Sequence, residues 1–138
     1  MFQPDDWQRL ISSLYEKTTL GKVVWTDERE SLYGTRHGAL SALMRASGAA
    51  ELVASVGSTS FRLGSSDGDG REPFFIEVSR RQEGGESVVD SIRTDTARFD
   101  PKMIEVALAV AMLYSVASEQ VHAQRNVVND IIAELDQL

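Results

Sequence analysis

Residues 52–63 read LVASVGSTSFRL, and this stretch of the chain decides the fold. At its centre, Gly57-Ser58 is a glycine-first dipeptide, which is typical of the two-residue type II′ turn of a β-hairpin. Side chains alternate along a strand, so this turn places six of them on one largely apolar face. The expected cross-strand pairs on that face are Val56 with Thr59, Ala54 with Phe61, and Leu52 with Leu63.

Further strands lie on both sides of this hairpin. Residues 74–79 and 87–93 alternate between apolar and polar side chains, with Gly84-Gly85 as the turn between them. The β-prone residues 22–26 bring the count to four or five strands. The apolar positions expected to share one face are Phe74, Ile76, Val78, Val88 and Ile92. A meander with one apolar face needs a layer of helices on that face.

The first segment has the signals of a helix over residues 4–20. Pro4 suits the first helical position, where a missing N–H group costs nothing. Phe2 and Trp7 occupy the positions of a hydrophobic staple, and apolar side chains then recur at helical spacing. A second, short helix is expected over residues 39–47.

The last segment is expected to be one long helix, or a kinked pair of helices, over residues 101–137. Asp100 suits the N-cap and Pro101 the first helical position. From residue 103 to 117 nearly every side chain is apolar, which predicts burial on more than one side. Beyond residue 120 the pattern narrows to a heptad-spaced line, like a short coiled coil. This line, called the seam below, consists of Val121, Gln124, Val128, Ile131, Leu135 and Leu138.

The length of this last helix is too great for a compact domain. One unbroken helix over residues 101–138 would be about 57 Å long at ~1.5 Å per residue. A domain of 138 residues has a radius of gyration of about 14 Å and is therefore about 37 Å across. Either the helix breaks near residues 115–120, or its end leaves the domain. In the second case the seam needs a partner, most simply a second copy of the chain.

Composition excludes several classes of function. The 138 residues fit a single domain, with 21 acidic and 14 basic residues and a net charge of −7. This balance argues against a general nucleic-acid binder, which needs a basic surface. The excess is net −3 over residues 49–99 and net −4 over residues 100–138. The absence of cysteine excludes a disulfide scaffold, a thiolate zinc site and a thiol nucleophile.

The sequence favours a cytoplasmic protein that does not bind membranes. Residues 1–6 lack the basic and apolar regions of a signal peptide. The most apolar stretch, residues 103–117, is shorter than the ~18–20 residues that span a bilayer.

Asp67, Asp69 and His37 are the candidates for chemistry. The two aspartates in a glycine-rich loop are weak candidates for a hard cation, because an EF-hand loop needs a third Asp or Asn and a later Glu. His37 could act as a general base, but the sequence contains no Gly-x-Ser-x-Gly motif to supply a nucleophilic serine. A solvated loop and a surface histidine are expected instead, with His122 partly exposed in the last helix. The expectation is therefore no catalytic residue, no cofactor and no metal.

The layout resembles a loose set of small uncharacterised bacterial proteins with a helix, a β-meander and a terminal helix. The matching residues are Gly21-Lys22-Val-Val-Trp25, the strands over residues 52–93, the Leu113-Tyr114 pair and the end over residues 128–138. Residues 27–50 have no counterpart in that set. The resemblance implies an α+β fold and no particular activity.

The chain is also similar to type III secretion chaperones in its size, its acidity and its long last helix. Those chaperones are small acidic α/β dimers that hold an extended segment of a partner protein. The meander, which lacks a central dimerisation helix, departs from their pattern.

The sequence thus predicts an α+β fold: an antiparallel meander of four to five strands packed on an N-terminal and a long C-terminal helix. Three functions remain open. The first is a non-catalytic interaction module that forms homodimers through the seam, with Val121, Val128, Ile131, Leu135 and Leu138 as interface candidates. The second is an acidic chaperone or immunity-type inhibitor of a basic protein partner. The third is a small cation-dependent hydrolase.

Overall fold

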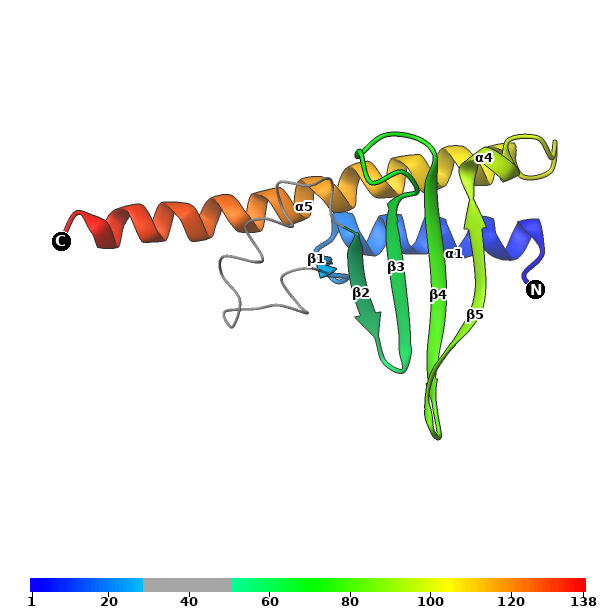
Figure 1. Ribbon diagram of the computed structural model, residues 1–138, viewed down its shortest axis with the longest axis horizontal. Coiled ribbons are helices and arrows are strands. Elements are labelled where there is room, and N and C mark those ends of the chain that lie inside the picture. Colours follow the sequence, from blue (N-terminus) through cyan, green and yellow to red (C-terminus); the bar gives the residue numbers. More distant parts are fainter. Residues whose placement is uncertain (29–50) are drawn as a thin grey trace.

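The computed structural model describes residues 1–28 and 51–138, and it confirms the α+β fold class. An N-terminal helix, a five-stranded antiparallel sheet and a long C-terminal helix follow one another (Figure 1). The strands lie in sequence order, so the sheet is a meander. The elements are α1 (Pro4–Thr19), β1 (Thr26–Asp27), β2 (Leu52–Val56), β3 (Thr59–Ser65), β4 (Phe74–Gln82), β5 (Gly85–Arg93), α4 (Thr94–Ala97) and α5 (Ile104–Asp136).

The central hairpin has the predicted register. Val56 pairs with Thr59, Ala54 with Phe61, and Leu52 with Leu63. Gly57 has a φ of +62°, a conformation that glycine adopts without steric cost. Turn chemistry and strand alternation therefore suffice to set this pairing.

The first helix begins as predicted at Pro4 and ends at Thr19. The side chain of Asp6 accepts a hydrogen bond of 3.0 Å from the backbone N–H of Gln3 and so closes the first turn. Phe2 packs edge-on against Trp7 at a ring separation of 5.1 Å, which is the contact that the staple positions predict. The predicted strand over residues 22–26 is mostly absent, because the strand that forms there, β1, spans only Thr26–Asp27.

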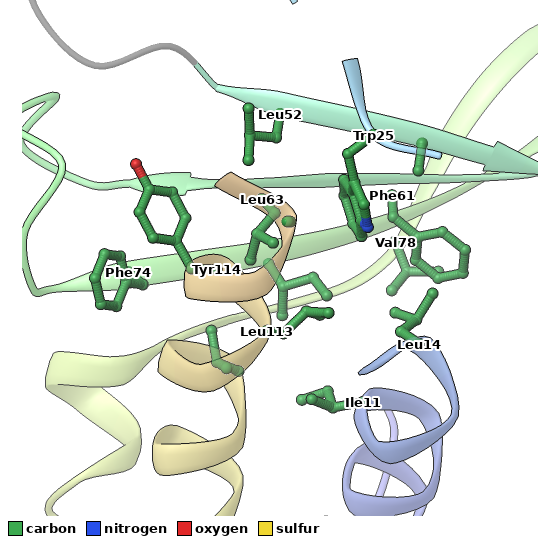
Figure 2. Close-up of a cluster of buried hydrophobic side chains, with 14 of the residues drawn as sticks. Ile11, Leu14, Trp25, Leu52, Phe61, Leu63, Phe74, Val78, Leu113 and Tyr114 are labelled. Atoms are coloured by element: carbon green, nitrogen blue, oxygen red, sulfur yellow. The ribbon is translucent and has the colours of Figure 1, made fainter. Parts of the chain in front are cut away.

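One face of the sheet and two helices enclose the hydrophobic core. α1 and α5 lie side by side across the sheet and run in the same direction (Figure 1). Figure 2 shows their apolar side chains and those of the strands meeting between the layers. The largest fully buried side chains are Trp25, Ile11, Leu63, Ile76, Leu113, Val106 and Val110.

The expectation that Val88 and Ile92 share a face is wrong, because β5 contains a bulge. Asp90 pairs with Val78 and Val88 with Ser79, so Val89 is an extra residue on β5. The extra residue reverses the alternation of side chains. Ile92 therefore packs against the core, whereas Val88 is exposed on the other face.

The start of the last helix is also displaced from its predicted position. Asp100 and Pro101 lie in a turn, and α5 begins at Ile104. The backbone N–H of Met103 donates to the carbonyl of Asp100 at 2.8 Å, while the Asp100 carboxylate accepts from the N–H of Lys102 at 3.0 Å. Both acceptors of Asp100 thus stabilise this turn instead of capping a helix.

Candidate functional site

α5 continues without interruption through residues 115–120 and leaves the domain (Figure 1). Its first half, residues 104–120, packs against the sheet and α1. Its second half, residues 121–136, projects past them. Below, the body means α1, the sheet, α4 and the first half of α5, and the distal half means residues 121–138.

Gln120 fixes the point at which α5 leaves the body. Its side-chain oxygen accepts a hydrogen bond of 2.7 Å from the backbone N–H of Trp25. Its side-chain nitrogen donates to the carbonyl oxygens of Val23 at 2.9 Å and Thr18 at 3.3 Å. The Trp25 indole N–H in turn donates to the Thr18 hydroxyl at 2.9 Å. One glutamine thus joins α5 to the connection between α1 and β1.

Replacing Gln120 with alanine is expected to lower the free energy of unfolding by about 2 kcal/mol, because it removes the partner of the Trp25 N–H and of the Val23 carbonyl. The Thr18 carbonyl still accepts from the N–H of Gly21. Urea denaturation measures the change. Glu119→Ala, at the exposed neighbouring position, is the matched control and should change stability by less than about 0.5 kcal/mol. Equal effects of the two substitutions would contradict the role of Gln120.

The seam is the continuation of the buried face of α5. Residues seven apart lie on nearly the same side of a helix. Along one such line, Ala107 and Tyr114 are buried, Val121 is half-buried, and Val128 and Leu135 are exposed. The same side of α5 that covers the core therefore carries its apolar character out of the body.

The described part of the body contacts only the base of the distal half, at Val121 and Arg125. The exposed fractions of its large apolar side chains run from 49% to 60%, and Leu138 is fully exposed. These side chains are Val127, Val128, Ile131, Ile132, Leu135 and Leu138. A contiguous apolar surface of this kind on a soluble protein typically marks an interaction site.

The predicted interface residues therefore do lie together, but the prediction was incomplete. Val128, Ile131, Leu135 and Leu138 are exposed along one side of the distal half, and Val121 lies half-buried at its base. The heptad rule left out Val127 and Ile132, which widen the seam on its two sides. The adjacent pairs Val127-Val128 and Ile131-Ile132 are the sequence signal that could have identified them.

A groove of about 410 Å³ lies where the seam meets the body. Thr26 and Asp27 of β1 form one wall of the groove. The other wall is formed by six residues of α5: Val121, Gln124, Arg125, Val128, Asn129 and Ile132. The guanidinium of Arg125 lies 3.9 Å from the buried carboxylate of Asp27. This ion pair holds the base of the distal half against the edge strand β1.

A second apolar surface lies on the outer side of the first half of α5. Burial of residues 103–117 on more than one side was predicted, and the structure contradicts this. Ile104, Leu108 and Met112 recur every four residues and are 45%, 61% and 56% exposed. Among the described residues, only the sheet and α1 cover this helix, because the helix layer that they form is one helix deep (Figure 1).

α5 has the length and hydropathy of a membrane-spanning helix. This is weak evidence for a membrane, because the core helix of a soluble protein passes the same test. Val106, Val110 and Leu113 of α5 are buried against the body.

Asp69 has a structural role in its loop. Its carboxylate accepts hydrogen bonds from the Ser65 hydroxyl and from the backbone N–H of Arg71, both at 2.9 Å. These bonds lower the pKa of Asp69. Among the described residues, no three His, Asp or Glu side chains lie close enough together to hold a metal ion. The weak candidates Asp67 and Asp69 therefore have no third ligand there.

Only one of the two histidines, His122, lies among the described residues. His122 is exposed on α5. His37 and the expected short helix over residues 39–47 lie outside the described residues.

The open face of the sheet carries a cluster of charged side chains around Arg62. Its guanidinium bonds the carboxylate of Glu28 at 2.5 Å and that of Glu51 at 3.2 Å. The backbone N–H of Glu28 also donates to the carbonyl of Glu51 at 2.9 Å. Burial, together with the hydrogen bond and charge of Glu28, raises the pKa of Glu51 to about 7. Burial opposes ionisation of Glu28, but its hydrogen bonds with Glu51 and Arg62 lower its pKa overall.

Glu51→Gln is expected to stabilise the protein at pH 8 and to lose this advantage at pH 5. The pKa of Glu51 is higher in the folded state than its ordinary value of 4.5, so folding becomes less favourable as the pH rises between those two values. Glutamine mimics the protonated form. Thermal unfolding at pH 5, 6, 7 and 8 tests this. Glu86→Gln, which removes a charge from an exposed position on the same face, is the control; a stabilisation by Glu51→Gln that does not vary with pH would contradict the assignment.

No protein-family model matches the chain, and comparison with curated proteins and with solved structures found no similar protein.

Proposed function

We propose that the protein is a non-catalytic interaction module that forms homodimers through the distal half of α5. The observation that carries this proposal is the seam, a largely apolar stripe that continues the buried core face of α5 onto its exposed distal half. A helix half that projects into water with this composition is incompletely stabilised by its own chain, because most helical stability in proteins comes from packing an apolar face.

The energetics favour a dimer of moderate affinity. Burying a Val, Leu or Ile side chain completely contributes about 1.5–3 kcal/mol. Five of the six exposed side chains are about half covered already, and Leu138 is fully exposed. On average each contributes roughly 1 kcal/mol more, or about 12 kcal/mol over two copies. Association costs about 4–15 kcal/mol in lost freedom. At the lower end of this cost about 8 kcal/mol remains, which corresponds to a dissociation constant in the micromolar range.

The heptad spacing of the seam indicates that its partner is the same helix of a second copy. Apolar side chains at heptad positions interdigitate with an equivalent set on a facing helix. Gln124 is the polar member, and a single polar residue at such a position sets the register of a helix pair. The seam has no charged member.

Sedimentation velocity across a range of protein concentrations tests self-association. The expected result is a mass that rises from 15.2 kDa toward twice that value between about 1 and 200 µM. A chain that remains monomeric over the whole range would contradict the proposal.

A second candidate function, capture of a basic protein, is favoured by the open face of the sheet. Glu28, Glu77 and Glu86 line a depression of about 260 Å³ there together with Arg62, and Glu51 forms an ion pair with Arg62. Acidic surfaces accelerate association with basic partners, and salt screens this effect. A complex captured at 0.05 M salt, released at 1 M and lost with Glu77→Lys would support this function. Capture that is insensitive to both salt and substitution would contradict it.

A further inference from the structure

The body of the protein lies on the same side of α5 as the seam. Ala107, Tyr114 and Val121 lie on one line of the helix with Val128 and Leu135. The first two are buried against the sheet and α1, whereas the last two are exposed. If the α5 of a second copy lay along this seam and continued toward residue 104, it would therefore collide with the body of the first copy.

This placement excludes a parallel pair of straight helices. In a parallel pair, the first half of the second α5 would lie beside the first half of this one, on the seam side. That space is filled by the core, including Trp25 and Ile11, each 0% exposed. An antiparallel pair avoids the collision because the two bodies then lie at opposite ends of the paired segment.

We infer that two copies pair their distal halves antiparallel, about a two-fold axis that passes between Val128 and Ile131. This inference rests on the proposed self-association and adds the orientation and register of the partner. The register follows from full overlap of the two seams, which places residue 121 of one copy opposite residue 138 of the other. The numbers of any two facing residues then add up to about 259. The facing pairs are Val121 with Leu138, Gln124 with Leu135, and Val128 with Ile131, each with its counterpart on the second copy.

The groove at the base of the distal half fits this arrangement. It extends along α5 from Val121 to Ile132, and in this register residues 127–138 of the second copy lie opposite. The second helix would then be enclosed on a further side by Thr26 and Asp27 of β1. The contact of the two helices alone is about 27 Å long at ~1.5 Å per residue, and the groove wall adds area toward the ~1,200 Å² of a stable interface.

The absence of cysteine allows the inference to be tested with single spin labels. His122→Cys, Asn129→Cys and Asp136→Cys place labels seven residues apart on one exposed side of the distal half. In the antiparallel register, the separation of equivalent sites along the axis is about 22 Å at residue 122, about 2 Å at 129 and about 20 Å at 136. Dipolar electron paramagnetic resonance should therefore give the shortest distance at residue 129 and clearly longer distances at both ends.

The other outcomes separate this inference from the proposed function. Three equal distances in a dimer would show parallel helices, and a shortest distance at residue 122 or 136 would show another register. Either result overturns the antiparallel inference and leaves self-association intact. No dipolar interaction in a protein of monomeric mass overturns both. Sedimentation of each labelled variant beside the unlabelled protein verifies that the label has not changed the assembly.

Discussion

Replacing Ile131 with aspartate is expected to raise the dissociation constant of the dimer by about a thousandfold. Ile131 lies next to the inferred two-fold axis, so each dimer contains the substitution twice at the centre of its interface. Losing two half-buried isoleucine contacts and burying two carboxylates costs about 4 kcal/mol or more, and 1.4 kcal/mol corresponds to a factor of ten. A dilution series followed by sedimentation velocity measures the shift.

Ala133→Asp is the matched control for this substitution. It introduces the same charge two residues away, on the exposed side of the helix opposite the seam. The control should dissociate within a few-fold of the wild-type protein. If both variants dissociate alike, general repulsion on an already acidic chain explains the effect, and the seam is not the interface. Far-ultraviolet circular dichroism verifies that the body of each variant remains folded.

Trp25→Ala is expected to give the largest loss of folding stability, about 3–5 kcal/mol. Trp25 is completely buried where the sheet, α1 and α5 meet (Figure 2), and its indole N–H donates to the Thr18 hydroxyl. Alanine leaves a cavity and removes this bond. Since a domain of this size has a total stability of about 5–15 kcal/mol, the variant should unfold at a much lower urea concentration.

The neighbouring Val24 supplies the control for this prediction. Val24 is 51% exposed, so Val24→Ala should cost less than about 0.5 kcal/mol. Comparison of the two variants by urea denaturation at one protein concentration separates core packing from any effect on assembly. A loss below about 1.5 kcal/mol for Trp25→Ala would contradict the central position assigned to the tryptophan.

The parts of the fold that depend on neighbouring residues could be predicted from the sequence. The register of β2 with β3 follows from Gly57-Ser58 and the alternation of side chains. The start of α1 follows from Pro4 and its staple. In each case, the residues that determine the structure lie within a few positions of one another, and no distant contact competes with them.

The features that were missed depend on contacts between distant segments. The bulge in β5 occurs where the carboxylate of Asp90 accepts a hydrogen bond from the backbone N–H of Phe2, 88 positions away. Gln120 binds the backbone of Trp25, 95 positions away. A pattern along the chain cannot specify such pairs.

The seam was predicted because heptad spacing is a local pattern, whereas its exposure was only one of two alternatives that the sequence left open. Its exposure follows from the depth of the helix layer and from the point, at Gln120, where α5 leaves the body. The outer surface of Ile104, Leu108 and Met112 shows the same limitation, since apolar composition alone predicted burial there.

Hydrogen–deuterium exchange of the distal half, measured as a function of protein concentration, tests self-association through the seam most directly. An isolated helix half of this length is marginally stable in water, so its backbone amides exchange slowly only when another surface covers them. The account predicts that exchange over residues 121–138 slows as the concentration rises through the dissociation constant, while exchange in the buried strands β3 and β4 does not change. Exchange over residues 121–138 that is the same at every concentration, whether fast or slow, would contradict it.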